Sequence, residues 1–76
     1  MKEILETVIL NLVDDKDSVS IKQIDGERST TFEVRVAEKD MGRVIGKQGR
    51  LAKSIRTLMK AAATREHKRV SVEFIG

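Results

Sequence analysis

The 76-residue chain contains no cysteine and no proline, and its only histidine is His67. The lack of cysteine excludes disulfide bonds and thiolate metal sites, and one histidine cannot form a histidine cluster, so we expect no metal and no cofactor. No apolar run approaches the roughly 18 to 20 residues that cross a bilayer, so we expect no membrane insertion. The first residues form an acidic amphipathic segment rather than a signal peptide, which predicts a cytoplasmic protein.

Aromatic residues are also scarce, because the chain has no tryptophan or tyrosine and only two phenylalanines, Phe32 and Phe74. Both phenylalanines fall on the expected inward faces of strands, so neither is free to stack on a base as in RRM and OB modules. Catalytic residues are missing as well, since His67 lies in a charged segment and no serine or threonine has a nearby base. The carboxylates show no apolar pocket that would raise a pKa. The sequence therefore does not predict an enzyme.

The formal net charge is only +3 at pH 7, but the charged residues are unevenly distributed. Residues 1–41 carry six basic and ten acidic side chains, whereas residues 42–69 carry nine basic side chains and one acidic side chain, Glu66. Local charge, rather than the total, determines what a surface attracts. The basic stretch favours a polyanionic ligand, although basic side chains that merely keep a helix in water would give the same count.

The periodicity of apolar residues predicts six elements. Ile24 breaks the alternation of apolar and polar residues in the first strand, over 19–23, and marks either a bulge or an early end of that strand. Asp40 is expected to N-cap the short helical turn, and Gly46 to end it. The first helix has one broad buried stripe that includes Ile4. The elements are a helix over 4–13, strands over 19–23 and 30–37, a short helical turn over 40–45, a long helix over 50–65 and a strand over 70–74.

Three strands with a helical layer on one face is the simplest architecture that buries every apolar stripe. The connection from the second strand to the third passes through both later helices, which permits a parallel pair. We therefore predict an α+β fold with the order α-β-β-α-α-β, a three-stranded mixed sheet with its helices on one face, and a single domain over residues 1–76. A chain this short gains stability when a partner or a second copy covers further apolar surface.

The segment between the two later helices contains Gly46 and Gly49 around two polar residues. Glycine permits positive φ and lets the backbone of a ligand approach closely. Free amides at the start of the following helix favour a phosphate, and Lys47 and Arg50 add positive charge. A plain corner between two helices is the alternative. A P-loop is excluded because only three residues separate Gly42 from Gly46, and no Gly-x-Gly pair follows a strand as a Rossmann motif requires.

The segment Val44-Ile45-Gly46-Lys47-Gln48-Gly49-Arg50, with Ile55 and Arg56 beyond it, resembles the core motif of KH domains. One helix and two strands precede the motif and one strand follows it, so the chain resembles the type II, bacterial KH arrangement over essentially its whole length. Because nothing else is attached, it is most similar to the KhpA family of small single-KH proteins.

The resemblance implies a protein that binds single-stranded RNA and acts as a post-transcriptional regulator or RNA chaperone, as a dimer. Single-stranded DNA stays open as a ligand. The loop would grip the sugar-phosphate backbone of about four nucleotides, and the bases would enter an apolar groove between the helices and a strand. Val44 and Ile45 belong either to the core or to the floor of that groove. Lys53, Arg56 and Lys60 are expected to extend the positive surface along the long helix. The RNA-binding residues would be Arg43, Gly46, Lys47, Gln48, Gly49, Arg50, Lys53 and Arg56.

The long helix also predicts a dimer interface. At about 100° per residue, Ile55, Met59 and Ala62 face the sheet, while Leu58 lies on the neighbouring edge. That edge is small and apolar enough for a second copy to approach. The alternatives are that Leu58 is only the rim of the core, or that the chain mainly pairs with a larger Jag-type partner that carries its own KH domain. The expected interface residues are Ser54, Leu58, Ala61 and Arg65.

Overall fold

The computed structural model describes residues 1–75, and Gly76 of the expected domain lies outside the described residues. The order of elements is the predicted α-β-β-α-α-β, and two single 3-10 turns, Lys16–Ser18 and Lys47–Gly49, are added to it. The α+β prediction is therefore confirmed. The elements are α1 (Lys2–Leu12), β1 (Ser20–Asp25), β2 (Ser29–Arg35), α2 (Glu38–Ile45), α3 (Arg50–Arg65) and β3 (Arg69–Ile75).

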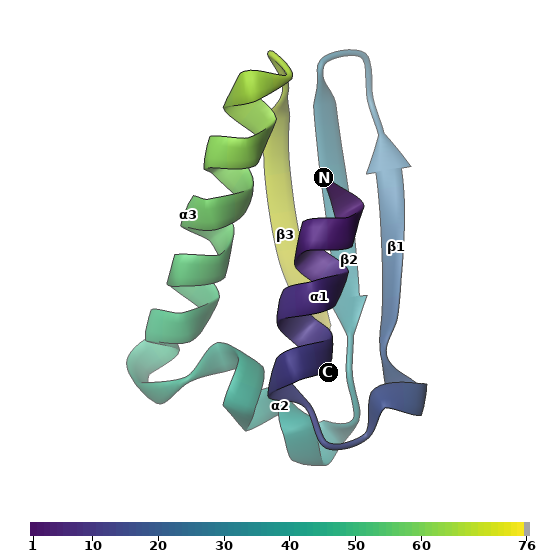
Figure 1. Cartoon of the computed structure of the whole chain (residues 1–76), viewed down its shortest axis with the longest axis vertical. Helices are drawn as coiled ribbons and strands as arrows, with labels where there is room; N and C mark the ends of the chain where they lie inside the picture. Colours follow the sequence, from purple (N-terminus) through teal and green to yellow (C-terminus); the bar gives the residue numbers. More distant parts are fainter. Residues whose placement is uncertain (76) are drawn as a thin grey trace.

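The three strands form one mixed sheet in the order β1-β2-β3. β1 pairs antiparallel with β2, and β3 pairs parallel with β2 through the predicted crossover. Ile24 pairs directly with Thr31, and the strand continues to Asp25 in the same register, so the expected bulge or early end at Ile24 is wrong. Figure 1 shows α1 and α3 on one face of the sheet, with α2 at the end where the chain turns into the loop.

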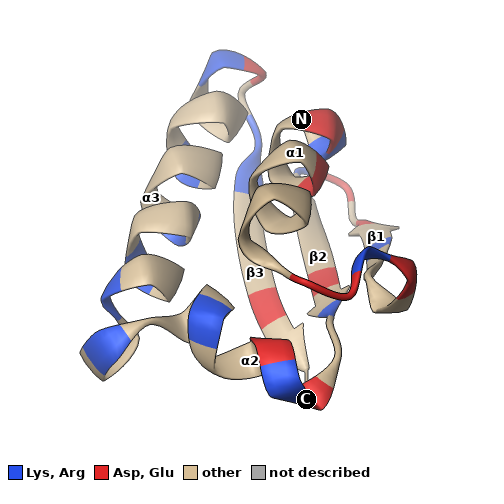
Figure 2. Cartoon of the chain, turned by 60° about the horizontal axis from the view of Figure 1, so that its bottom comes forward, with Lys and Arg blue, Asp and Glu red and all other residues tan. Residues whose placement is uncertain are grey.

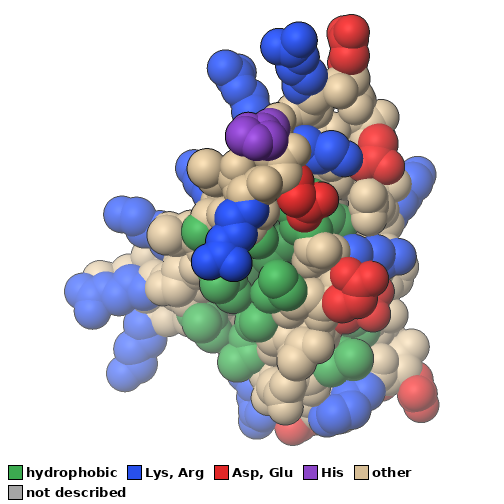
Figure 3. All heavy atoms as spheres, turned by 45° about the horizontal axis from the view of Figure 1, so that its top comes forward, with side chains coloured by type: hydrophobic (Ala, Val, Ile, Leu, Met, Phe, Trp, Pro, Cys, Tyr) green, Lys and Arg blue, Asp and Glu red, His purple; other side chains and the backbone are tan. Residues whose placement is uncertain are grey.

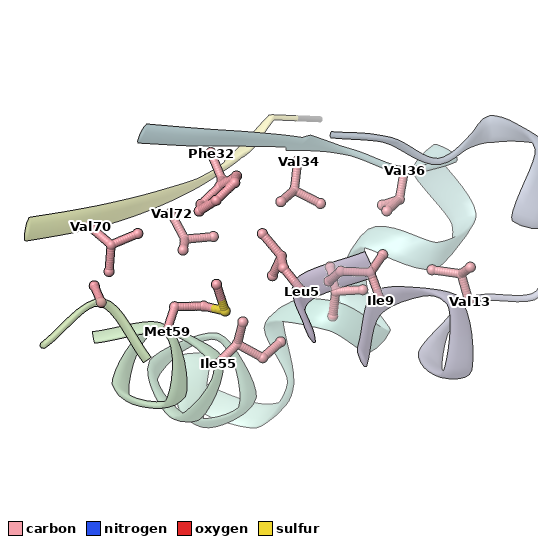
Figure 4. Packing of buried hydrophobic residues seen from close by; sticks show 12 residues of the cluster. Leu5, Ile9, Val13, Phe32, Val34, Val36, Ile55, Met59, Val70 and Val72 are labelled. Atoms are coloured by element: carbon pink, nitrogen blue, oxygen red, sulfur yellow. The ribbon is translucent and has the colours of Figure 1, made fainter. Parts of the chain in front are cut away.

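The core lies between the sheet and the two longer helices (Figure 4). Phe32 on β2 is fully buried, as are Leu5 on α1 and Met59 on α3. Alternation on the strands and helical spacing on α1 and α3 bring these apolar faces together, as the sequence predicts. Ile4 is a correction, because its side chain is 42% exposed and lies outside the buried stripe of α1.

Asp40 does not cap α2, which is the second correction. Ala37 occupies the N-cap position, and Asp40 lies inside the first turn with its side chain buried. Its carboxylate accepts the backbone N–H of Asp14 at Oδ1 (3.1 Å) and that of Asp15 at Oδ2 (3.0 Å). A carboxylate that accepts two backbone hydrogen bonds holds the loop after α1 onto α2. The hydrogen bond from the N–H of Asp15 has the largest effect on the pKa of Asp40, and the bond from Asp14 adds to it. Together they hold this pKa below its ordinary value, although burial raises it.

These hydrogen bonds predict an acid-sensitive contribution of Asp40 to stability. A carboxyl with a lower pKa in the folded state stabilises the fold above its unfolded pKa of about 4, and this stabilisation is lost as the pH falls through the folded value. We expect Asp40→Asn to lower the Tm by several degrees at pH 7 and by less at pH 3. Asp17→Asn, on an exposed turn, is the control. Equal Tm losses at pH 7 and pH 3 would show that the charge of Asp40 is irrelevant.

Candidate nucleic-acid interface

Gly46 ends α2 in a conformation that only glycine adopts readily. Its φ is 76° and its ψ is 176°, and its N–H donates to the carbonyl of Gly42 (2.9 Å). A Cβ added to Gly46 would lie 2.7 Å from the Cβ of Leu51 and 3.0 Å from its backbone nitrogen. Any side chain at this position would therefore collide with the first turn of α3. The sequence expectation that Gly46 ends the helix and opens the loop is confirmed.

The rest of the loop leaves the start of α3 open. Gln48 and Gly49 both have left-handed φ values, 57° and 72°, and the N–H of Gly49 donates to the carbonyl of Gly46 (3.2 Å). Gly49 is the N-cap residue of α3, and within residues 1–75 no side chain caps this helix. The N–H of Arg50 donates to the carbonyl of Lys47 in the 3-10 turn. The N–H groups that follow it in the first turn of α3, with the positive end of the helix dipole, are available to an anion. A phosphate oxygen matches this arrangement.

Basic residues lie on the loop and on the helices beside it (Figure 2). Lys47, Gln48 and Arg50 are exposed, as the sequence predicts for ligand-binding side chains. Arg43, which the sequence places beside the loop, donates instead to Asp14 Oδ1 at 3.0 Å. Because both partners are more than half exposed, this ion pair contributes little to stability and leaves Arg43 accessible.

Val44 and Ile45 differ in their surroundings. Val44 is fully buried and belongs to the core, whereas Ile45 is half-buried and packs against the core from its edge. The sequence left open whether these residues belong to the core or to the floor of the groove, and the structure confirms the core for Val44. Ile45 retains surface next to the loop.

Arg56 joins α3 to the edge strand β3. Its Nε donates to the carbonyl oxygen of Val72 (3.1 Å), and its guanidinium carbon lies 5.4 Å from the centre of the Phe74 ring, which is a cation–π contact. This contact covers one face of Phe74, which is half-buried against the core, and Phe32 is fully buried. Beside Arg56 a hollow of about 270 Å³ opens between α3 and β3. Its lining residues are Arg56, Lys60, Val70, Ser71 and Val72.

A family model and several known proteins are similar to this chain in sequence. Residues 2–74 match the family model described as KhpA/KhpB, KH domain. The chain belongs to this family. It is 56% identical over 75 residues to the RNA-binding protein KhpA of Clostridium acetobutylicum, which covers 99% of this chain and 100% of that protein. The RNA-binding protein KhpA of Caldanaerobacter subterraneus subsp. tengcongensis is 53% identical over 99% of this chain and 100% of its own length.

A more distant relative shows how far the similarity extends. The RNA-binding protein KhpA of Borreliella burgdorferi is 42% identical over 73 residues, which are 96% of this chain and 89% of that protein. No solved structure was found to match the chain. The KH family model covers the loop, both flanking helices and all three strands, so the type II KH fold and the family of this chain are established.

Arg56 and Lys53 give a testable contrast within this KH domain. Lys53 is exposed on α3, and we expect Lys53→Ala to weaken binding of all RNA sequences alike and to flatten the salt slope by about 0.7, the value for one phosphate of a single strand. Arg56→Ala should in addition lower stability by about 1 kcal/mol, because it removes the hydrogen bond to Val72. Fluorescence titrations at four salt concentrations and a urea melt measure both effects. An unchanged slope for both variants would place the two residues away from the RNA.

A second hollow, of about 470 Å³, lies between the start of α1 and the second half of α3. Leu58 is 44% exposed here, next to the hollow that it lines. Figure 3 shows the apolar surface of this region with both basic and acidic side chains at its border. Three of the four expected interface residues, Leu58, Ala61 and Arg65, line the hollow, whereas Ser54 does not. The sequence reading missed Met1 and Ile4, which complete its apolar wall.

Among residues 1–75, no three His, Cys, Asp or Glu side chains gather as a metal site would require. None of the helices in this range is long and apolar enough to span a membrane. His67 is exposed in the turn after α3 and has a left-handed φ of 57°.

Proposed function

We propose that this chain binds single-stranded RNA, with the loop Gly46–Gly49 on the sugar-phosphate backbone and the bases in the groove between α3 and β3. The observation that carries the proposal is the open loop itself: two left-handed glycines, the uncapped start of α3 and exposed Lys47 meet at one place. Membership of the KH family and relatives named RNA-binding protein support it. The proposal includes the cytoplasmic role, as an RNA chaperone or post-transcriptional regulator, that the resemblance implies.

Base pairing is expected to prevent binding. KH domains receive unpaired bases, and a duplex hides the base edges that a groove of this kind would contact. The scarcity of free aromatic faces leaves much of the affinity to phosphate contacts, which salt weakens. The same argument predicts a loose sequence preference and does not separate RNA from single-stranded DNA.

Titration of fluorescein-labelled RNA tests the proposal. The isolated protein should bind a 12-nucleotide single strand with a slope of log K against log salt of about −3 or steeper, because the loop alone would contact about four phosphates. It should bind the matching duplex much more weakly. A single-stranded DNA of the same sequence measures the contribution of the 2′-hydroxyl groups. Equal affinity for single strand and duplex would contradict the proposal.

We further propose that the apolar hollow between α1 and α3 is the dimer interface. Contiguous exposed apolar surface on a small domain marks an interaction site, and this hollow contains Ile4 and Leu58, two of the large apolar side chains that are more than 40% exposed. Ser54, Ala61 and Arg65 lie exposed on the same helix and would meet the second copy. A Jag-type KH-containing chain is the alternative occupant.

A further inference from the structure

The hollow beside Arg56 continues beyond the middle of α3. A neighbouring hollow of about 370 Å³ shares Lys60, Val70 and Ser71 with it. Both hollows follow the edge of β3 that no strand of residues 1–75 covers, so they form one groove that ends at the turn between α3 and β3. The additional lining residues of this end of the groove are Thr64, Lys68 and Arg69.

The side chains that line the two hollows carry four positive charges and no negative charge. Besides Arg56 these are Lys60, Lys68 and Arg69, and none of the four pairs with a carboxylate within residues 1–75. Lys60, Lys68 and Arg69 are exposed, and the hydroxyl of Ser71 lies among them, whereas the hydroxyl of Thr64 donates to the carbonyl of Lys60 (2.9 Å). Ammonium and guanidinium groups beside hydroxyl groups are the usual contacts of phosphate oxygens.

The position of these residues relative to the loop is set by α3. The loop precedes the first residue of the helix, and Lys68 and Arg69 follow its last turn. Sixteen residues at about 1.5 Å each separate the two ends by about 24 Å. A base-stacked strand that advances about 3.4 Å per nucleotide covers this length with about seven nucleotides, more than the four that a KH loop clamps.

We propose that Lys60, Lys68 and Arg69 form a second phosphate-binding site, which holds the RNA strand where it leaves the groove at the end opposite the loop. This site rests on the proposed function, because it requires a strand that is already seated on the loop. It would add affinity only for RNA longer than the loop's own four nucleotides. Figure 2 shows that basic residues continue from the loop along α3 to the start of β3.

Oligouridines of four and twelve nucleotides test this site. We expect Lys68→Ala/Arg69→Ala to weaken the 12-mer about tenfold and to flatten its salt slope by about 1.4, which corresponds to two phosphates. The 4-mer, measured by NMR titration at low salt, should change less than twofold. Lys60→Gln, which leaves β3 untouched, should weaken the 12-mer about threefold. The control is Lys22→Ala/Arg35→Ala, which removes the same two charges from exposed positions on β1 and β2.

Each result bears on the site. If Lys68→Ala/Arg69→Ala bound the 12-mer as tightly as the wild type, the second phosphate-binding site would be overturned. An acidic protein partner would then be the better candidate for this end of the groove. Equal losses for 4-mer and 12-mer would also overturn the site, because the residues would then belong to the loop's own four nucleotides. Lys47→Asp/Gln48→Asp should weaken both lengths, which separates the two sites. If the wild-type protein bound neither oligomer, the proposed function itself would be contradicted, and this site with it.

Discussion

Replacement of Lys47 and Gln48 with aspartate is expected to weaken RNA binding about 100-fold, or about 2.8 kcal/mol, while the domain stays folded. The change removes one positive charge and adds two negative charges beside the uncapped start of α3, where the phosphates would lie. Both side chains are exposed, and aspartate tolerates the left-handed φ of Gln48 better than most residues. The Tm should therefore shift by only a few degrees.

The chain offers a matched control for this variant. Lys22 and Gln23 form the same dipeptide on β1, and both side chains are exposed. Lys22→Asp/Gln23→Asp changes the net charge by the same amount at a distance from the loop, and we expect it to weaken RNA binding less than threefold. Similar losses in the two variants would mean that total charge, rather than the loop, determines binding. A loop variant that binds as tightly as the wild type would place the RNA elsewhere.

The second large effect is expected for Leu58→Asp, which should convert a dimer into a folded monomer. The carboxylate would have to enter an apolar contact between two copies, and we expect the dimer to weaken about 30-fold or more, which is about 2 kcal/mol. The side chain is 44% exposed in the single chain, so the monomer should keep its fold. Its Tm should lose the dependence on protein concentration that a dimer shows.

Light scattering beside a thermal melt decides this prediction. Thr57→Asp is the control, because Thr57 is the exposed neighbour on α3 and does not line the hollow. It adds the same charge and should leave the dimer intact. A wild-type protein that is monomeric at high micromolar concentration would contradict the homodimer. A Leu58→Asp protein that melts far below the wild type would show that Leu58 belongs to the core.

Local patterns in the sequence predict most of the fold. Alternation around Phe32 and Val34 predicts a strand with one buried face, and the spacing of Ile55 and Met59 predicts the inner side of α3. The glycines at 46 and 49 predict the loop, because the φ values required there are those that glycine permits. For these features the physical cause lies within a few residues of the effect.

Features that depend on contacts between distant segments were missed. Asp40 resembles an N-cap by its neighbours, but its hydrogen-bond partners are backbone groups 25 and 26 residues earlier in the chain. Ile4 continues the stripe of α1, yet the sheet and α3 cover less of the helix than the stripe would allow. The hydrogen bond of Arg56 to Val72 depends on how α3 lies beside β3. A sequence pattern shows which face of a helix is apolar, but not how much of it a neighbour covers.

The most direct test of RNA binding by the loop is an NMR titration of the ¹⁵N-labelled protein with a 12-nucleotide single strand. Backbone amide signals report the loop itself, because the proposed phosphate contacts are made by the N–H groups at the start of α3. The account predicts the largest shifts for residues 46–51, with smaller shifts along the groove at Arg56 and Val72. Large shifts on the open face of the sheet, at Lys22 and Glu33, with unchanged loop signals would contradict it.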